Sequence, residues 1–208
     1  MTDFIRRCGR SLEAGGILLI LINVLFTPLM ISRRGAGPPE ATALFLARQS
    51  TSAVAALLLI FGCLGIHLVQ REVYGRLGAG AFLAAFVGGC LLFAVEWGNV
   101  FLVQPVARIA PAAFAAVDKD TFSNLGFASA AGLFALGWLA LSLTTWRFGN
   151  LSRPAAIATF VGILSIPILQ ALFKTPGAIL GNAIFGAGLT ALGRATAGRD
   201  ASQKAVPR

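Results

Sequence analysis

Apolar residues recur in long, uninterrupted runs along most of this chain, and short polar stretches separate them. A helix needs about 20 mostly apolar residues to cross the hydrocarbon core of a bilayer. Six runs approach that length: 15–31, 52–70, 78–97 or 78–103, 124–146, 154–173 and 176–192. The pattern predicts an all-α integral membrane bundle of about six transmembrane helices.

The polar stretches predict how this domain is bounded. We expect an N-terminal segment at 1–14, a transmembrane domain at 15–193 and a polar C-terminal tail at 194–208 that frays. Prolines, glycines and charges predict that 35–40 and 104–121 lie outside the hydrocarbon, and 41–48 is expected to form a short interfacial turn of helix. An uncleaved first helix is favoured over a signal peptide, because no clean small-residue cleavage site follows the apolar run.

Composition supports a lipid environment. Hydrophobic residues make up 57% of the chain and charged residues 12%, whereas an average soluble domain has roughly 25% charged residues. So few charges cannot cover the surface of a soluble protein of this size. The lipid bilayer is therefore the first expected partner.

The distribution of basic residues predicts the orientation. Six spans place both termini on one side, where eleven Lys and Arg residues fall, against six on the other side, Arg48 and Arg108 among them. The positive-inside rule then predicts cytoplasmic termini. The formal charge of +9 is scattered in ones and twos between apolar runs, unlike the clustered patch of a nucleic-acid-binding surface, so no nucleic acid is expected as a partner.

Glu96 is the main candidate for a functional side chain, because a carboxylate within a span is costly unless it is neutralised, paired or hydrated. It is a candidate ligand or ion site with Asn99, one helical turn away on the same face. The alternative is a Glu that reaches interfacial water or bonds to a neighbouring helix. Arg108 could pair with Glu96 only if the chain folds back.

His67 is the one histidine of the chain and a second candidate for ligand binding, although a structural interfacial role is the alternative that we favour. No Cys/His cluster has metal-ligand spacing, and Cys8, Cys63 and Cys90 form no CxxC pair. Nucleotide-binding loops and a GxSxG elbow are missing too. The sequence thus names no catalytic residue, no metal site and no cofactor.

Polar residues and prolines within the spans have a simpler interpretation. Asn23, Gln170 and Asn182 are expected to form hydrogen bonds across helices, and Pro167 is expected to kink the fifth helix. Small residues recur, including the GxxxG of Gly177 and Gly181, which favours close packing of helices, self-association or assembly with other membrane subunits.

Three stretches resemble a family of uncharacterised small polytopic membrane proteins of bacteria. They are EWGNVFLVQPVARIAP (96–111), FALGWLALSL (134–143) and GNAIFGAGLTALGRA (181–195). The resemblance implies a helical bundle in the bacterial inner membrane, and it assigns no catalytic residue.

Three functions remain open on the sequence alone. The absence of catalytic motifs and the small-residue packing signals favour a non-enzymatic structural, accessory or regulatory role. A small transporter or ligand-binding membrane protein built around Glu96 is the alternative. An intramembrane enzyme acting on lipid or quinone is the third and has no motif to support it.

Overall fold

The computed structural model describes residues 2–32, 38–117 and 120–203, which are helical almost throughout and contain no strand. This confirms the predicted all-α class. In chain order the elements are α1 (Thr2–Leu21), the π-helical turn η1 (Ile22–Phe26), α2 (Thr27–Ser32), the 3-10 turn η2 (Pro39–Ala41), α3 (Ala43–Gln70), α4 (Gly75–Gly98), the π-helical turn η3 (Asn99–Val103), α5 (Gln104–Ile109), α6 (Pro111–Val117), α7 (Thr121–Phe148) and α8 (Arg153–Gln203).

The last helix, α8, is a hairpin of two arms, 153–173 and 175–203. Lys174 separates them with φ of 55° and ψ of −131°, a conformation that is rare for a residue with a side chain. The arms run antiparallel, because Gly162 lies against Phe185 and Gly188 against Thr159. Five segments of the described chain are long and apolar enough to cross a membrane. Since the fifth is this hairpin, its two arms bring the apolar passes of the described residues to six, in agreement with the predicted count of about six.

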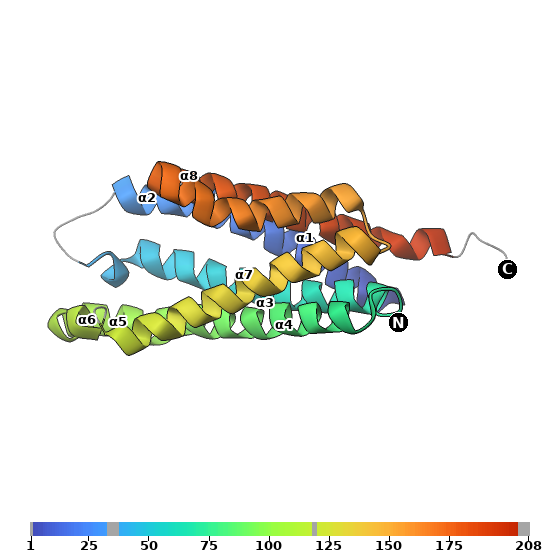
Figure 1. The fold of residues 1–208 in the computed structure, drawn as a ribbon. Helices are drawn as coiled ribbons and strands as arrows, with labels where there is room; N and C mark the ends of the chain where they lie inside the picture. The colour runs from blue at the N-terminus through green and yellow to red at the C-terminus, as the bar shows by residue number, and fades with distance from the viewer. Residues whose placement is uncertain (1, 33–37, 118–119, 204–208) are drawn as a thin grey trace.

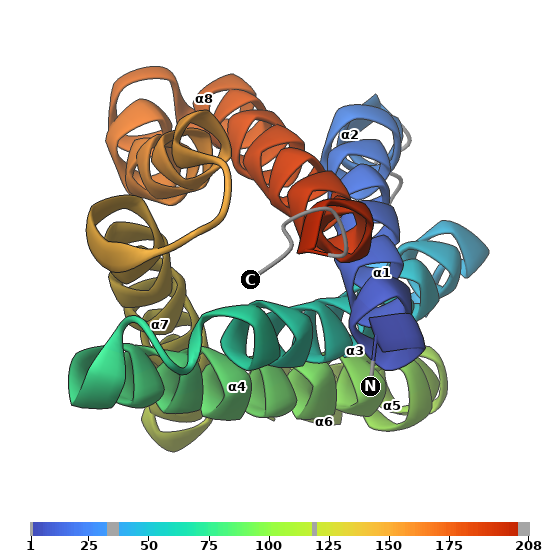
Figure 2. The ribbon, with the colours of Figure 1, turned by 90° about the vertical axis from the view of Figure 1, so that its right-hand side faces the viewer.

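The helices form a closed ring. Each packs against the next along the chain, and the second arm of α8 returns to pack along α1 (Figure 2). The start of α1 and the end of α8 lie at one end of the bundle, which we call the terminal end (Figure 1). The opposite end, where α2, α5 and α6 lie, is the distal end.

Several helices extend beyond the apolar runs that predict them. Helix α1 begins at Thr2, so the predicted N-terminal segment 1–14 is a continuous part of the first helix, and α3 begins at Ala43, so 41–48 is not a separate interfacial turn. The predicted fraying is also wrong for residues 194–203, since α8 continues to Gln203 and Thr196 is buried. Residues 33–37 of the predicted connector, and 204–208 of the tail, lie outside the described residues.

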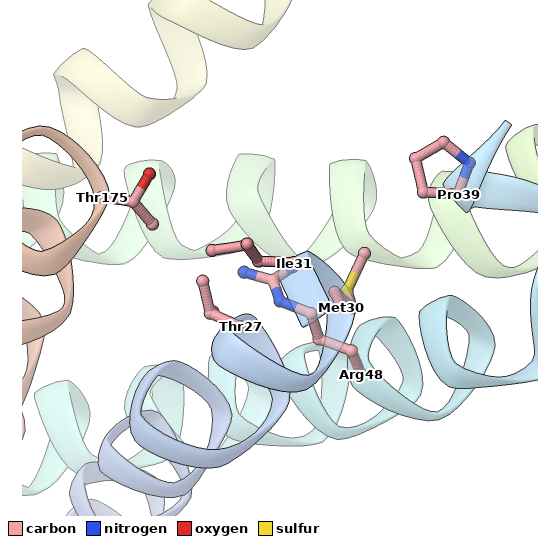
Figure 3. Close-up of a pocket in the computed structure, with 6 residues that line it drawn as sticks. All are labelled: Thr27, Met30, Ile31, Pro39, Arg48 and Thr175. Atoms are coloured by element: carbon pink, nitrogen blue, oxygen red, sulfur yellow. The ribbon is translucent and has the colours of Figure 1, made fainter. Parts of the chain in front are cut away.

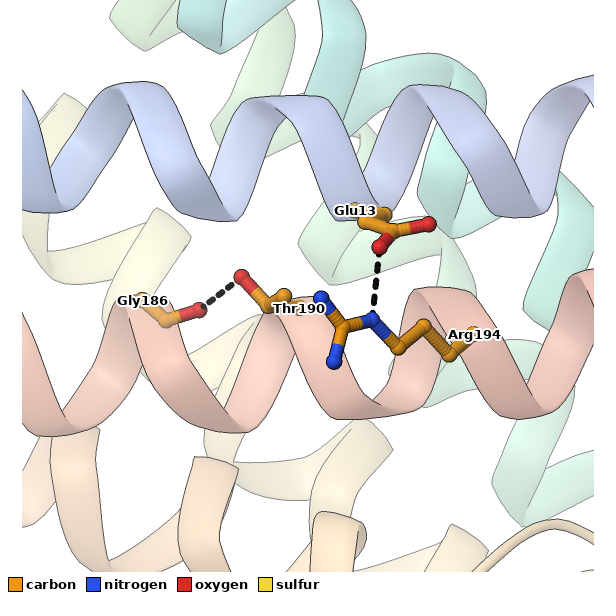
Figure 4. A network of polar contacts seen from close by, with 4 residues as sticks. All are labelled: Glu13, Gly186, Thr190 and Arg194. Carbon is orange, nitrogen blue, oxygen red and sulfur yellow. Dashed lines mark hydrogen bonds and ion pairs between the residues drawn. The ribbon is translucent and has the colours of Figure 1, made fainter.

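Glycines allow α1 and α8 to pack with their backbones in close contact. Gly9 and Gly16 of α1 face Gly193 and Gly186 of α8, and a Cβ atom added to Gly193 would lie 2.4 Å from the backbone nitrogen of Glu13. Figure 4 shows the polar contacts along the same pair of helices. The Nε of Arg194 donates to Oε1 of Glu13 at 2.6 Å, and the Thr190 hydroxyl donates to the Gly186 carbonyl at 2.8 Å.

The predicted GxxxG also packs within the chain. Gly177 lies against Leu169, and Gly181 lies against Ile166, so both glycines serve the contact between the two arms of α8. Small residues lower the distance between helix axes where lipid supplies no hydrophobic drive for association.

Two prolines each follow a π-helical turn. Pro28 comes directly after η1 and Thr27, and Pro105 after η3 and Gln104. Proline has no N–H to donate, and its ring clashes with the carbonyl four residues earlier. A wider turn before the proline relieves this clash. The helix therefore continues from α4 through Pro105 to Ile109, and the stretch 104–121 that we expected outside the hydrocarbon is mostly helical.

The outer surface of the ring is apolar. Val54, Leu83, Leu136 and Ile168 are each more than half exposed, although they lie in the middle of long helices. Such a surface is costly in water and favourable in lipid. Together with the candidate spans, it identifies a multi-pass membrane protein.

Candidate functional site

A cavity of about 480 Å³ lies inside the ring, in its distal half. This volume is within the range of small-molecule sites in proteins. All six passes contribute to the wall, which combines polar and apolar side chains: Leu19, Ile22, Asn23, Arg48, Ser52, Ala55, Ala56, Leu59, Leu92, Glu96, Phe127, Ala131, Phe134, Ala135, Ile163, Ile166, Pro167, Gln170, Asn182 and Phe185.

Two opposite charges line this cavity. Arg48 of α3 and Glu96 of α4 interact electrostatically across it. They do not form a direct ion pair, since the ion pairs within 4 Å among the described residues are Arg6–Asp3 and Arg194–Glu13. The electrostatic attraction partly offsets the cost of keeping each charge within a span.

Glu96 is positioned as the sequence predicts with respect to Asn99. The Asn99 side chain at the start of η3 is within hydrogen-bonding reach of the Glu96 carboxylate. The Oε2 atom of Glu96 is buried and has no hydrogen-bond partner among the described residues. The opposing charge is Arg48, and not Arg108, which is exposed on α5.

Arg48 was missed by the sequence reasoning, which assigned it to the segment before the second span. A signal for it exists, however. Arg48, Ser52, Ala55, Ala56 and Leu59 all line the cavity, and their spacing of three and four residues places them on one face of α3. An arginine that shares a helix face with several small residues is expected to point into the bundle.

His67 lies far from this cavity. It is 19 residues beyond Arg48 on α3, which corresponds to roughly 28 Å along the helix. Its ring stacks on Phe82 with 4.1 Å between centroids, and its Nδ1 contacts the Tyr74 hydroxyl at 3.1 Å. Burial raises the pKa of that hydroxyl above its ordinary value, so the phenol stays protonated and able to donate. The structure therefore does not bring His67 together with Glu96 and Asn99.

The three polar residues that the sequence analysis singled out in other spans also line the cavity. Asn23 and Asn182 donate to the carbonyls of Leu19 and Ala178, each four residues earlier in the same helix, at 2.9 Å. The side-chain NH2 groups of Asn23 and Asn182 therefore donate within their own helices, and the predicted hydrogen bonds across helices are wrong for them. Gln170 lines the cavity as well.

Pro167 lies in the first arm of α8, but the sharp reversal of the chain comes at Lys174. Because proline lacks an N–H, the carbonyl of Ile163, four residues earlier, loses its helical donor. Both residues line the cavity.

Aromatic rings close the cavity toward the terminal end. Phe134 and Phe185 line it and pack edge to face, with 6.2 Å between ring centroids. Behind them Trp138 is 1% exposed and packs against both rings. The cavity therefore has a polar part near Arg48 and Glu96 and an apolar floor toward the centre of the bundle.

A second pocket of about 240 Å³ lies further toward the distal end (Figure 3). Thr27, Met30, Ile31, Pro39 and Thr175 line it together with Arg48, which it shares with the larger cavity. We call it the outer pocket. Arg48 therefore stands where the outer pocket meets the main cavity.

Among the residues that the structure describes, no three His, Cys, Asp or Glu side chains lie close enough together to hold a metal ion. The site that can be described by its geometry is therefore the cavity with its two charges. We compared the chain with protein-family models, with curated proteins and with solved structures, and none of them matches.

Proposed function

We propose that this multi-pass membrane protein binds a small solute in its central cavity and acts as a receptor or transporter for it. The observation that carries the proposal is the cavity itself, to which all six passes contribute and in which Arg48 and Glu96 face the same space. Concave sites with an apolar wall and a few convergent polar groups are typical of small-molecule binding.

A structural or accessory role was favoured by the sequence, but such a role does not require an internal cavity with two charges. A bundle that served only as a scaffold would fill this volume with apolar side chains, because empty space forfeits packing contacts. No catalytic motif supports the enzyme hypothesis. Solute binding is therefore the function that accounts for the most features of the chain.

The proposal includes an orientation in the bacterial cytoplasmic membrane. Five arginines lie at the terminal end: Arg6, Arg7 and Arg10 in the first half of α1, Arg71 directly after α3, and Arg76 in the first turn of α4. The positive-inside rule then makes this end cytoplasmic. The cavity and the outer pocket would face the opposite side, from which the solute would enter.

Thiol labelling of two neighbouring positions on α3 tests this proposal. Ser52 lines the cavity, whereas Val54 is 51% exposed on the outer face at the same depth. Cys90 is exposed and Cys8 and Cys63 are buried, so Cys90→Ala provides the background. We expect a charged, water-soluble methanethiosulfonate reagent to modify Ser52→Cys and not Val54→Cys.

The side of labelling tests the orientation. Right-side-out vesicles should label Ser52→Cys at least about tenfold faster than inverted vesicles, because the aromatic floor blocks access from the terminal end. If Ser52→Cys reacts from neither side, or no faster than Val54→Cys, the cavity is not open to water and the proposed function is rejected.

A further inference from the structure

The cavity combines features that fit one class of solute. Its two charges, Arg48 and Glu96, have opposite signs, interact across the cavity and are not directly paired. A solute with a single charge would pair with one of them and leave the other without a direct ionic partner. A solute that carries both charges would satisfy both.

Each charged group has hydrogen-bonding capacity left for such a solute. The Oε2 atom of Glu96 is buried and has no partner among the described residues, so it can accept from a solute ammonium group. One N–H group of Arg48, at Nη1, donates to Gln49. A guanidinium has five N–H donors in all, and the planar fork suits a carboxylate.

The wall of the cavity toward the centre of the bundle is apolar. Leu59, Phe134, Ile163 and Phe185 lie on the side toward the centre of the bundle. These groups cannot form hydrogen bonds through their side chains, and they gain free energy by burying an apolar group. The solute should therefore carry an apolar tail that points away from its charged head.

The outer pocket extends this arrangement toward the distal end. It includes the hydroxyl-bearing side chains Thr27 and Thr175, and it reaches Arg48 (Figure 3). A solute entering through this pocket would meet the guanidinium before it met Glu96. An arginine at the junction favours the approach of an acidic group.

We propose that the solute is a small amphipathic zwitterion, such as an α-amino acid with an apolar side chain. Its acidic group binds Arg48, its ammonium group binds Glu96, and its apolar tail lies on the floor formed by Leu59, Phe134 and Phe185. This inference rests on the proposed function and adds the chemical class of the ligand. A lipid headgroup with the same pair of charges shares this chemistry, and the experiment below distinguishes it from a soluble zwitterion.

Calorimetric titration of the full-length protein in detergent micelles tests the inference. The probes share a six-carbon chain and differ in the head: L-norleucine is zwitterionic, hexanoate is anionic and hexylamine is cationic. Titration into empty micelles corrects for partitioning. We expect norleucine to bind at least about tenfold more tightly than either singly charged probe, since each charge-assisted hydrogen bond adds to affinity.

Two cavity variants test which charged group of the solute binds each residue. Glu96→Gln should remove the preference for norleucine over hexanoate, and Arg48→Gln should remove the preference over hexylamine. Glu72→Gln and Arg76→Gln are matched controls, because both residues are exposed at the terminal end. They should leave both preferences unchanged. The comparison of probes on the wild-type protein remains decisive if either cavity variant fails to fold.

The outcomes separate this inference from the proposed function. If hexanoate or hexylamine binds as tightly as norleucine, the cavity binds solutes but the zwitterion inference is wrong. If dihexanoyl phosphatidylethanolamine displaces norleucine at lower concentration, the ligand is a lipid head and the inference of a soluble solute is wrong. If no probe binds, the inference fails, and the labelling of Ser52→Cys decides separately whether the cavity is accessible.

Discussion

The two halves of this bundle are built from the same six passes but pack differently. The terminal half is closed by a core that includes Leu12, Cys63, Ile66, Trp138 and Leu141, each at most 2% exposed. The distal half contains the cavity of about 480 Å³. The same helices therefore approach closely at one end and leave room at the other.

Backbone chemistry explains the difference. Gly9 and Gly193 bring α1 and α8 into backbone contact toward the terminal end. Pro28, Pro105 and Pro167 all lie in the distal half, where two of them follow π-helical turns. Glycine permits close approach of helices, whereas proline and wide turns interrupt the regular helical surface. The comparison teaches that the cavity follows from where these residues lie along each helix.

The largest expected effect comes from widening the closed half. Gly193→Ala places a Cβ atom 2.4 Å from the backbone nitrogen of Glu13, so α1 and α8 must separate. We expect a loss of about 3 kcal/mol in the free energy of unfolding, measured by denaturation in detergent. Gly80→Ala is the control, because nothing lies within 4 Å of its Cβ, and it should stabilise the helix slightly. Equal effects of the two variants would show that α1 and α8 are not in close contact.

Replacing an alanine by leucine should lower the free energy of unfolding in the closed half but hardly change it in the half with the cavity. Ala156→Leu overfills the closed half, where Ala156 is fully buried, and should cost about 1–3 kcal/mol. Ala131→Leu adds the same atoms to the cavity wall and should change stability by less than about 0.5 kcal/mol. Ala131→Leu should also weaken norleucine binding. If both variants destabilise equally, the distal half is as densely packed as the terminal half.

The closed half also contains a buried polar contact that can be tested. Nε2 of Gln70 on α3 donates to the Thr145 hydroxyl on α7 at 3.1 Å, and both side chains are fully buried. Thr145→Val should cost about 1 kcal/mol, because it leaves the Gln70 amide without this acceptor. Adding Gln70→Met should recover most of the loss in a double-mutant cycle. Additive losses would mean that the two side chains do not interact.

The smallest expected effect lies at the start of α7, at the distal end. Asp120 caps this helix by accepting from the Ser123 backbone N–H at 2.8 Å and its hydroxyl at 3.0 Å. The Ser123 backbone N–H holds the pKa of the Asp120 carboxyl below its ordinary value. A depressed pKa means that the contribution of the cap is present above the ordinary pKa and is lost as pH falls through the lowered one. Protection of the Ser123 amide from hydrogen exchange should follow that titration, and Asp120→Asn should make it independent of pH.

The candidate site was predicted in part. Glu96 and Asn99 stood out because polar groups within an apolar run are costly, and the structure places Asn99 within hydrogen-bonding reach of Glu96, which lines the cavity. Arg48 was missed, because a charge near the end of an apolar run is indistinguishable from an interfacial anchor until the helix start is known. His67 was proposed as the one histidine of the chain, with a structural role favoured, and it lies toward the other end of the bundle.

The sequence by itself determined the class of this protein and the number of its passes. In lipid, the backbone N–H and C=O groups of a long apolar run can form hydrogen bonds only with each other, so each run must become a helix. Only the tertiary structure decided which faces meet. The contact between Gly193 and Glu13, and the approach of Arg48 to Glu96, join residues far apart in the chain. Such contacts depend on how whole helices pack, and hydrophobicity along one helix carries no information about the neighbour that it will meet.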